Sequence, residues 1–267
     1  MIREITGFSN PLVKRVRALR DKKARREEGL FLAEGLRILT EALDAGQAPV
    51  MLWFAPESAD HPLVERLIAA TEKRGGDVFM TSHDILSKLS GKDNPGTVLG
   101  VYPELWTPLA KVDRSKASIW IVAERLRDPG NLGTILRTGD AVGAGGLILV
   151  DDCTDPFSVE AVRASMGALF TQSVSKASWP DFLAWLREGP GQLVGTSLNT
   201  SNDYQDPRYE APVFLLVGNE SQGLPQDYEK DCDLLVKMPM MGKADSLNAA
   251  VATSVMAYEI LNQFRKR

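Results

Sequence analysis

The chain has 267 residues, of which 44% are hydrophobic and 25% charged, and its formal net charge at pH 7 is −4. This length allows one large or two modest domains. No apolar run approaches the ~20 residues that span a bilayer, and Met1 to Pro11 lack the segments of a secretory signal. Cys153 and Cys232 form no C-x-x-C pair. We therefore expect a globular cytoplasmic protein with free thiols.

Basic residues gather near the N-terminus. Residues 1–30 hold nine Lys or Arg against four Asp or Glu, a balance of +5, so the remaining residues carry −9. Apolar residues at helical spacing, such as Val13 and Val16, predict that the basic side chains form an exposed stripe on a packed helix. Such a stripe attracts polyanions such as RNA, and a solvated helix face is the alternative. The nine are Arg3, Lys14, Arg15, Arg17, Arg20, Lys22, Lys23, Arg25 and Arg26.

The chain divides into two halves. Between residues 29 and 103, helical periods alternate with short apolar runs, which predicts a small α/β domain. The following stretch contains Pro103 and Pro108 with mixed charge and is typical of a linker. We expect a first domain over 1–107, a linker over 108–117 and a second domain over 118–267.

The second half predicts a parallel sheet. Its apolar runs have the length of strands and are separated by helical stretches. Runs that are apolar on both faces belong in a parallel sheet covered on both sides, where ligands bind at the carboxyl ends of the strands. Gly218 to Gly223 follow one such run, so we expect a site there. The runs are 118–126, 145–152, 192–198, 213–220 and 233–240.

Several familiar chemistries find no support in the sequence. The segment NESQG has Asn219 where a serine-hydrolase elbow needs glycine, and His61 and His83 both precede the serine. The glycines of 142–147 follow a helical stretch and precede a strand, the reverse of a dinucleotide loop. Lys243 lacks the glycine of a P-loop, and no acidic triplet suggests a metal site. The site must use amides, carboxylates, arginine and backbone.

Three blocks of the second half, residues 127–143, 214–224 and 237–259, resemble in order and spacing the three motifs of the SpoU/TrmH family of RNA ribose 2′-O-methyltransferases, within the SPOUT superfamily. Residues 155–170 resemble the region between its first two motifs. The resemblance implies a parallel-sheet α/β SPOUT domain with a C-terminal trefoil knot. It also implies a homodimer with active sites near the interface and S-adenosylmethionine as cofactor.

The N-terminal half has its own resemblance. Residues 10–35 resemble the ribosomal-protein-like RNA-binding domain that some family members carry before the catalytic domain. Structured ribosomal RNA is the preferred substrate, because this appended domain is typical of members that act on ribosomal RNA. Transfer RNA stays an alternative. The other alternative is a non-catalytic RNA-binding or ribosome-assembly factor on the same fold.

The resemblance assigns site residues by position. S-adenosylmethionine carries no phosphate, so closely approaching backbone loops can bind it, and glycines permit that approach. Ordinary turn chemistry is the alternative for each cofactor position. Met238 stands where the family usually has a β-branched residue, and Gly130 where a larger residue is common. The cofactor positions are Thr196, Gly218, Met238 and Leu247. The catalytic positions are Asn131, Arg137, Glu220, Ser246 and Asn248. No metal ligand is assigned.

The catalytic roles leave alternatives open. Arg137 matches the arginine at the 2′-hydroxyl, and a guanidinium that stays charged favours stabilising an alkoxide or phosphate over acting as a base. Asn131 can share its site only from the turn before the helix, as an N-cap, and capping alone is a rival role. Glu220 can hold arginine or ribose, or only close the fold. Ser246 and Asn248 can orient substrate or cofactor, or Ser246 can be a helix cap.

Overall fold

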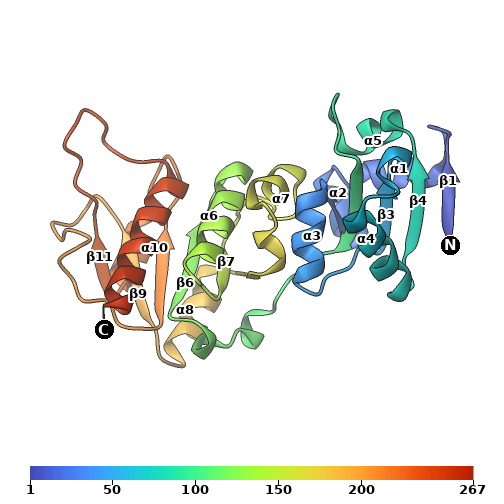
Figure 1. Cartoon of the computed structure of the whole chain (residues 1–267). Helices are drawn as coiled ribbons and strands as arrows, with labels where there is room; N and C mark the ends of the chain where they lie inside the picture. Colours follow the sequence, from blue (N-terminus) through green and yellow to red (C-terminus); the bar gives the residue numbers. More distant parts are fainter. Residues whose placement is uncertain (267) are drawn as a thin grey trace. The chain divides into compact units, whose positions relative to one another are not determined.

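The computed structural model describes residues 1–266 and divides them into two compact units (Figure 1). The first unit contains residues 1–105 and 155–171, and the second contains 106–154 and residues from 172 onward. Within residues 1–266, no helix is long and apolar enough to cross a membrane. Each unit has its own sheet and its own core.

The first unit has a mixed sheet of five strands in the order β1-β4-β3-β5-β2. β1, β4 and β3 are parallel, and β5 runs antiparallel to β3 and β2. The sequence analysis predicted this α/β class but not the first strand. The strands are β1 (Ile2–Ile5), β2 (Leu30–Glu34), β3 (Met51–Phe54), β4 (Asp77–Thr81) and β5 (Val98–Pro103). The helices are α1 (Pro11–Ala18), α2 (Lys22–Glu28), α3 (Leu36–Asp44), α4 (Pro62–Lys73), α5 (His83–Ser90) and α7 (Val159–Ser165).

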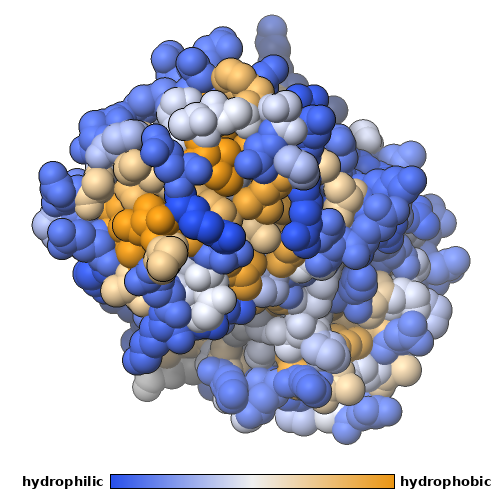
Figure 2. All heavy atoms as spheres, turned by 90° about the vertical axis from the view of Figure 1, so that its right-hand side faces the viewer, coloured by the Kyte–Doolittle hydropathy of each residue, from blue (hydrophilic) through white to orange (hydrophobic). Residues whose placement is uncertain are grey.

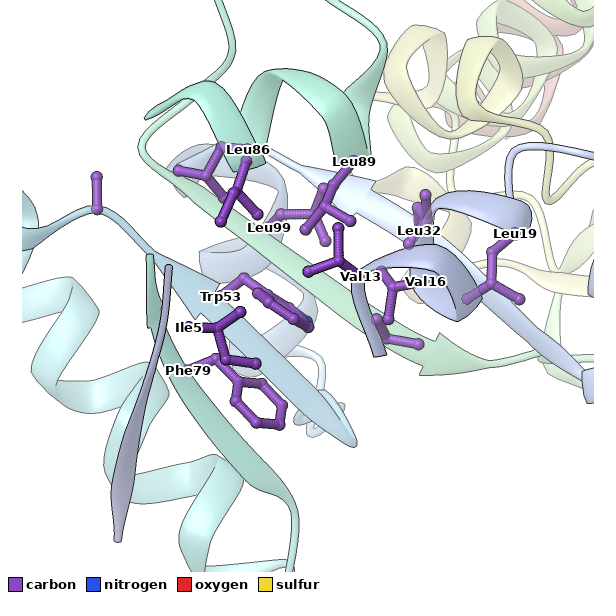
Figure 3. Packing of buried hydrophobic residues seen from close by; sticks show 13 residues of the cluster. Ile5, Val13, Val16, Leu19, Leu32, Trp53, Phe79, Leu86, Leu89 and Leu99 are labelled. Atoms are coloured by element: carbon purple, nitrogen blue, oxygen red, sulfur yellow. The ribbon is translucent and has the colours of Figure 1, made fainter. Parts of the chain in front are cut away.

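Two helices, α1 and α5, pack their apolar side chains into one cluster over this sheet (Figure 3). α1 starts where Pro11 sets a helical φ and the Asn10 side chain accepts the N–H of Leu12. Its buried Val16 lies in one cluster with Leu89 of α5 and Trp53 of β3. This packing sets α1 and α5 side by side, so polar residues of both helices lie on the outer surface.

The basic stripe is only partly as expected. The helical stretch breaks after Ala18 and restarts at Lys22, and Arg25 is 3% exposed. The Arg25 guanidinium donates to the carbonyls of Leu19 and Arg20 and forms an ion pair with Asp155 at 2.7 Å. The prediction that all nine basic residues are exposed is therefore wrong for Arg25, which closes the turn between the two helices.

The segment 155–171 packs in the first unit. Its Phe157 ring lies 5.0 Å from the ring of Phe31 in β2, and both side chains are fully buried. The sequence analysis included this segment in the second domain. The packing unit therefore differs from the predicted range 118–267, because an aromatic contact and the Arg25 ion pair outweigh position in the chain. The predicted domain boundaries themselves stay a prediction.

The second unit has six parallel strands in the order β11-β9-β10-β6-β7-β8. The parallel sheet was expected, whereas β8, a mostly polar run, was not. The strands are β6 (Ile119–Glu124), β7 (Gly146–Val150), β8 (Ser173–Ala177), β9 (Gln192–Thr196), β10 (Val213–Val217) and β11 (Leu234–Val236). The helices are α6 (Pro129–Ala141), α8 (Trp179–Arg187), α9 (Gln226–Asp231) and α10 (Ala249–Arg265). The trefoil knot stays a prediction.

Alternation along the strands explains why these runs are apolar throughout. Trp120 of β6 and Phe214 of β10 stack and belong to one cluster with Phe182 of α8. The next residue, Ile121, points to the other face, where it approaches Gly139 of α6. α6 and α10 lie side by side on that face (Figure 1). Both faces of the sheet are therefore covered by helices.

The strand order creates a topological switch point between β6 and β10. From β6 the chain proceeds through β7 and β8 to one edge, and it returns to build β9, β10 and β11 on the other side. The loops that leave β6 and β10 at their carboxyl ends therefore separate and open a crevice, the usual ligand position in such sheets.

The buried ion pair of the first unit can be tested with Asp155→Ala. Loss of the carboxylate leaves the Arg25 guanidinium buried without its counter-ion, so we expect a loss of about 3 kcal/mol or more in the free energy of unfolding. The control is Glu28→Ala, which breaks the half-exposed pair with Arg15 and should cost less than about 1 kcal/mol. Urea denaturation followed by circular dichroism measures both. Equal losses would contradict the assignment.

Candidate functional site

A hollow of about 380 Å³ lies at the carboxyl ends of three neighbouring strands, β9, β10 and β11. Loops after each strand line it, together with the approach to α10. This volume is in the range of small-molecule sites. Of the residues expected at the site, the hollow is lined by Thr196, Gly218, Glu220, Met238, Ser246 and Leu247. All four expected cofactor positions therefore line one hollow.

Asn219 holds the loop that follows β10. Its side-chain oxygen accepts the N–H groups of Ser221 and Gln222 at 3.0 and 3.2 Å, and its backbone carbonyl accepts the N–H of Gly223 at 2.9 Å. Its side-chain amide donates to the carbonyl of Arg125 at 2.9 Å. The sequence analysis treated Asn219 only as a missing elbow glycine. The amide instead closes the turn and ties it to the end of β6.

Gly218 is required by a close backbone approach. A Cβ atom at this position would lie 2.5 Å from the carbonyl carbon of Gly223 and 2.6 Å from the backbone nitrogen of Leu224. Such distances are shorter than van der Waals contact, so a side chain would push the loop open. Gly218 therefore allows the two ends of the loop 218–224 to pack against each other.

Glu124, at the end of β6, is a buried carboxylate that the sequence analysis missed. Its side chain is 1% exposed and lies 3.3 Å from Nε of Arg125, a residue held at a positive φ of 44°. Desolvation raises the pKa of Glu124, and the charge of Arg125 and a hydrogen bond from the backbone of Asn219 partly offset this. The sequence does carry a signal for Glu124, because it is an acidic residue at the end of an otherwise apolar strand. Glu124 supports the loop through Asn219.

Glu220 joins the two loops of the switch point. Its carboxylate accepts the backbone N–H groups of Arg127 and Asp128 and the side-chain amide of Asn131, all at 3.2 Å. Desolvation alone would raise the pKa of Glu220. The hydrogen bonds from its own backbone, from Asn131 and from the two N–H groups outweigh that effect and hold the pKa below its ordinary value. Glu220 is therefore an ionised acceptor at neutral pH.

Asn131 connects Glu220 to the start of the last helix. Its side-chain oxygen accepts the amide of Asn248 at 2.9 Å, and the Asn248 oxygen in turn caps α10 by accepting the N–H of Ala250. Glu220, Asn131 and Asn248 thus form one hydrogen-bonded row, which we call the polar row. It brings together one residue from each of the three blocks.

Two capping expectations are wrong. Asp128, and not Asn131, is the N-cap of α6, because its carboxylate accepts the N–H of Asn131 at 2.6 Å. This leaves the Asn131 side chain free for the polar row. Ser246 is not a helix cap either, since α10 begins after Asn248; its hydroxyl donates to Asp245 at 3.2 Å.

Arg137 lies away from the polar row. It stands six residues after Asn131 on α6, about 9 Å farther along the helix axis, and it does not line the hollow. Its side chain is exposed, and no residue within 1–266 pairs with it by hydrogen bond or ion pair. The next residue, Thr138, bonds Ser254 of α10 at 2.7 Å. Arg137 therefore faces solvent beside the α6–α10 contact.

Charges around the hollow select against phosphate. Its charged lining residues are three carboxylates, Glu220, Glu229 and Asp245, and one ammonium, Lys237. A phosphorylated ligand would be repelled, whereas a cationic one would be attracted. Within residues 1–266, no group of three His, Cys, Asp or Glu could hold a metal ion. The hollow suits a phosphate-free organic cation.

The low pKa of Glu220 makes its contribution dependent on pH. Because the folded pKa lies below that of the unfolded chain, about 4.3, the stabilisation is complete above that pH and is lost as the pH falls through the folded value. We expect Glu220→Gln to lower the melting temperature at pH 7, and we expect the difference to shrink as the pH falls below about 4. Scanning calorimetry between pH 3 and 8 measures this. The control is Glu210→Gln at an exposed position; a similar pH-dependent difference there would refute the explanation.

Solved structures share this fold over the whole chain. An S-adenosylmethionine-bound rRNA methyltransferase from Sinorhizobium meliloti is 41% identical, with 98% of each chain covered and a TM-score of 0.92. The SpoU methyltransferase AviRb from Streptomyces viridochromogenes is 28% identical, with 96% of this chain and 98% of that chain covered and a TM-score of 0.87.

Sequence comparisons agree with the structures. The 23S rRNA (guanosine(2553)-2′-O)-methyltransferase RlmP from Bacillus subtilis is 29% identical, and the match covers 97% of this chain and 99% of that protein. Residues 10–100 match the MRM3-like substrate binding domain. Residues 118–258, more than half of the chain, match the SpoU rRNA Methylase family. The resemblance found in the three blocks is thereby confirmed, and the chain belongs to the SpoU rRNA methylase family.

Proposed function

We propose that this protein is an enzyme that transfers a methyl group from S-adenosylmethionine to a ribose 2′-hydroxyl of ribosomal RNA. The polar row carries the proposal, because it joins the three blocks at the rim of a hollow suited to a phosphate-free cation. Relatives named as 23S rRNA 2′-O-methyltransferases support the reaction and the substrate class.

The hollow fits the cofactor in size and charge. Thr196, Gly218, Met238 and Leu247 would hold it together with the backbone of the surrounding loops. Gly218 lines the hollow without a side chain that would fill it, and the carboxylates favour a positive ligand. When bound, the cofactor supplies a methyl group activated by a sulfonium. The reaction proposed here requires no metal ion.

The polar row positions the site. Glu220 accepts the N–H groups of Arg127 and Asp128, so two hydrogen bonds anchor the loop before α6. Asn131 and Asn248 hold each other in orientation, and Ser246 lies beside them at the hollow. A preorganised polar edge of this kind aligns the ribose for in-line attack, which supplies several kcal/mol of the rate acceleration.

Arg137 has a different role in this proposal. Arginine is a poor base in proteins because its guanidinium is a lasting cation, so we assign Arg137 to the developing alkoxide or the adjacent phosphate and not to proton removal. No neighbouring carboxylate within 1–266 neutralises it, which leaves its full charge for RNA. It lies outside the hollow, so a second protein copy is needed to enclose the reacting ribose.

That second copy would dock on α10. Val251, Val255 and Tyr258 are 49%, 37% and 47% exposed and recur at helical spacing, which makes an apolar stripe on the outer face. Such a stripe is typical of a helix packed against a partner. Arg137 borders it through the Thr138–Ser254 contact. We therefore propose a homodimer with Arg137 at the edge of its interface.

The first unit would recruit the RNA. Its match to a substrate-binding domain supports this role, and structured RNA is recognised by shape and by phosphate contacts. We place the protein in the cytoplasm, where this substrate would be met. Ribosomal RNA is preferred over transfer RNA. An intact polar row argues against a non-catalytic RNA-binding factor.

Methyl transfer from tritium-labelled S-adenosylmethionine to ribosomal RNA tests the reaction. We expect Arg137→Ala to lower kcat at saturating RNA by about 100-fold or more, with the cofactor Kd from calorimetry unchanged because Arg137 does not line the hollow. The control, Arg208→Ala, removes another exposed arginine of the second unit. Near-normal turnover of Arg137→Ala would refute its role.

Two further results would decide the wider proposal. A folded sample that takes up no S-adenosylmethionine, even with RNA present, would overturn it. Mapping of 2′-O-methyl groups in total RNA, with and without the protein, should find the new mark in ribosomal RNA. A mark in transfer RNA alone would support the alternative substrate.

The dimer is tested by Val255→Glu. Burying a carboxylate in an apolar interface is costly, so we expect light scattering to report a monomer and methyl transfer to fall at least tenfold. The control is Ile2→Glu, an exposed apolar position of the first unit, which should leave the dimer intact. A Val255→Glu protein that stays dimeric would place the interface elsewhere.

A further inference from the structure

The first unit contains a second hollow, of about 480 Å³, beside α1 and α5. Its lining includes the cations Arg17, Arg20, Lys88 and Lys92 and the ring of Phe8, and we call it the basic hollow. Residues near position 17 and residues near position 90 meet here, because α1 and α5 pack into one apolar cluster over the sheet. Figure 2 shows the molecule from the right-hand side of Figure 1, where hydrophilic residues surround apolar patches.

Three of the four cations of the basic hollow have no acidic partner among the described residues. Elsewhere, Arg15 pairs with Glu28 and Arg25 with Asp155. Arg17, Arg20 and Lys88 are exposed, and no carboxylate within residues 1–266 lies in ion-pair distance of them. Their charge is therefore available to a ligand.

The remaining lining residues lower the positive charge of the basic hollow. Lys92 is already paired with Glu34 at 2.8 Å, so it contributes less charge. Asp84 and Asp93 also line the basic hollow, which leaves four cations against two carboxylates. A polyanion is still favoured, and carboxylates can accept hydrogen bonds from ribose hydroxyls. This mixture suits RNA better than an isolated inorganic anion.

Gly91 leaves the space that the Arg20 guanidinium occupies. A Cβ atom on Gly91 would lie 2.2 Å from Cζ of Arg20, so the guanidinium lies directly against the backbone at the end of α5. Gly91 has a φ of +75° and ends the helix in the left-handed conformation. A side chain at position 91 would displace the guanidinium, so glycine leaves Arg20 its place in the lining of the basic hollow.

Phe8 adds a surface for a base. Its side chain is 49% exposed, although most large apolar side chains of this unit are buried. The ammonium of Lys88 lies 5.9 Å from its ring centroid, a distance at which a cation and an aromatic face attract each other. Unpaired bases stack on exposed aromatic rings next to cations in single-strand binding sites.

We propose that the basic hollow binds an unpaired stretch of the substrate RNA, with phosphates on Arg17, Arg20 and Lys88 and one base stacked on Phe8. The inference rests on the proposed function for the identity of the RNA. It adds the place on the first unit where the RNA is held and the conformation in which it is held. Recognition of an unpaired base favours loops over continuous duplex.

Fluorescence anisotropy of the full chain tests this, with a labelled 12-nucleotide single-stranded RNA and its duplex as probes. The variant Arg17→Ala/Arg20→Ala/Lys88→Ala should raise the Kd for the single strand at least tenfold. It should reduce the slope of log Kd against log salt by about two, because each lost phosphate contact contributes about 0.7. The cofactor Kd should stay within twofold, which shows that the second unit is intact.

A matched control removes three unpaired cations outside the basic hollow, with Lys14→Ala/Lys22→Ala/Arg26→Ala. We expect a Kd change of less than threefold and a smaller change in salt slope. Equal losses in the two triple variants, or no loss in the variant of the hollow, would overturn the inference.

Phe8 is tested separately from charge. Phe8→Ala should raise the single-strand Kd about tenfold without changing the salt slope, and Phe8→Trp should restore binding. Loss of duplex binding only would contradict the stacked base. If the unaltered protein binds RNA in this manner but transfers no methyl group to ribosomal RNA, the proposed function is wrong, whereas the inference that the basic hollow binds RNA is still supported.

Discussion

The carboxylate of Glu220 is the constraint on which the site depends. It accepts three donors, two from the loop before α6 and one from the first turn of α6, across the point where the strand order reverses. The loops after β6 and β10 would otherwise separate at this point. Charge-assisted hydrogen bonds to backbone N–H groups are stronger than neutral ones. One side chain therefore fixes both the rim of the hollow and the start of α6.

Support for this carboxylate extends into the sheet and the last helix. Asn219 holds the turn that presents Glu220, and the end of β6 holds Asn219. Asn131 transmits the position of Glu220 to Asn248, which is also the N-cap of α10. Because α10 packs beside α6, the same polar row connects the hollow to the helix whose apolar stripe we assign to a dimer. The hollow and the proposed interface are thus neighbours.

The hollows of the two units differ in charge. The second unit offers a negatively lined hollow with backbone walls, whereas the first offers unpaired cations and an exposed ring. The net charge of −4 hides this division. In our proposal the negative lining keeps RNA phosphates out of the hollow of the second unit, and the cations of the first unit bind them instead. This arrangement suits an enzyme whose cofactor is cationic and whose substrate is a polyanion.

The sequence by itself determined the parallel sheet and the family, and it predicted a site at the ends of the strands, because apolar runs, glycine turns and motif spacing are local signals. Thr196, Gly218, Met238 and Leu247 could be placed at one hollow in this way. Tertiary structure decided that Asp128 caps α6 and frees Asn131, that Arg25 is buried, and that Lys88 joins Arg17. Asn131 meets Glu220 89 residues away, and Arg25 meets Asp155 130 residues away. Hydrogen bonds and ion pairs between such distant residues leave no periodic pattern in the chain, so only the folded structure shows them.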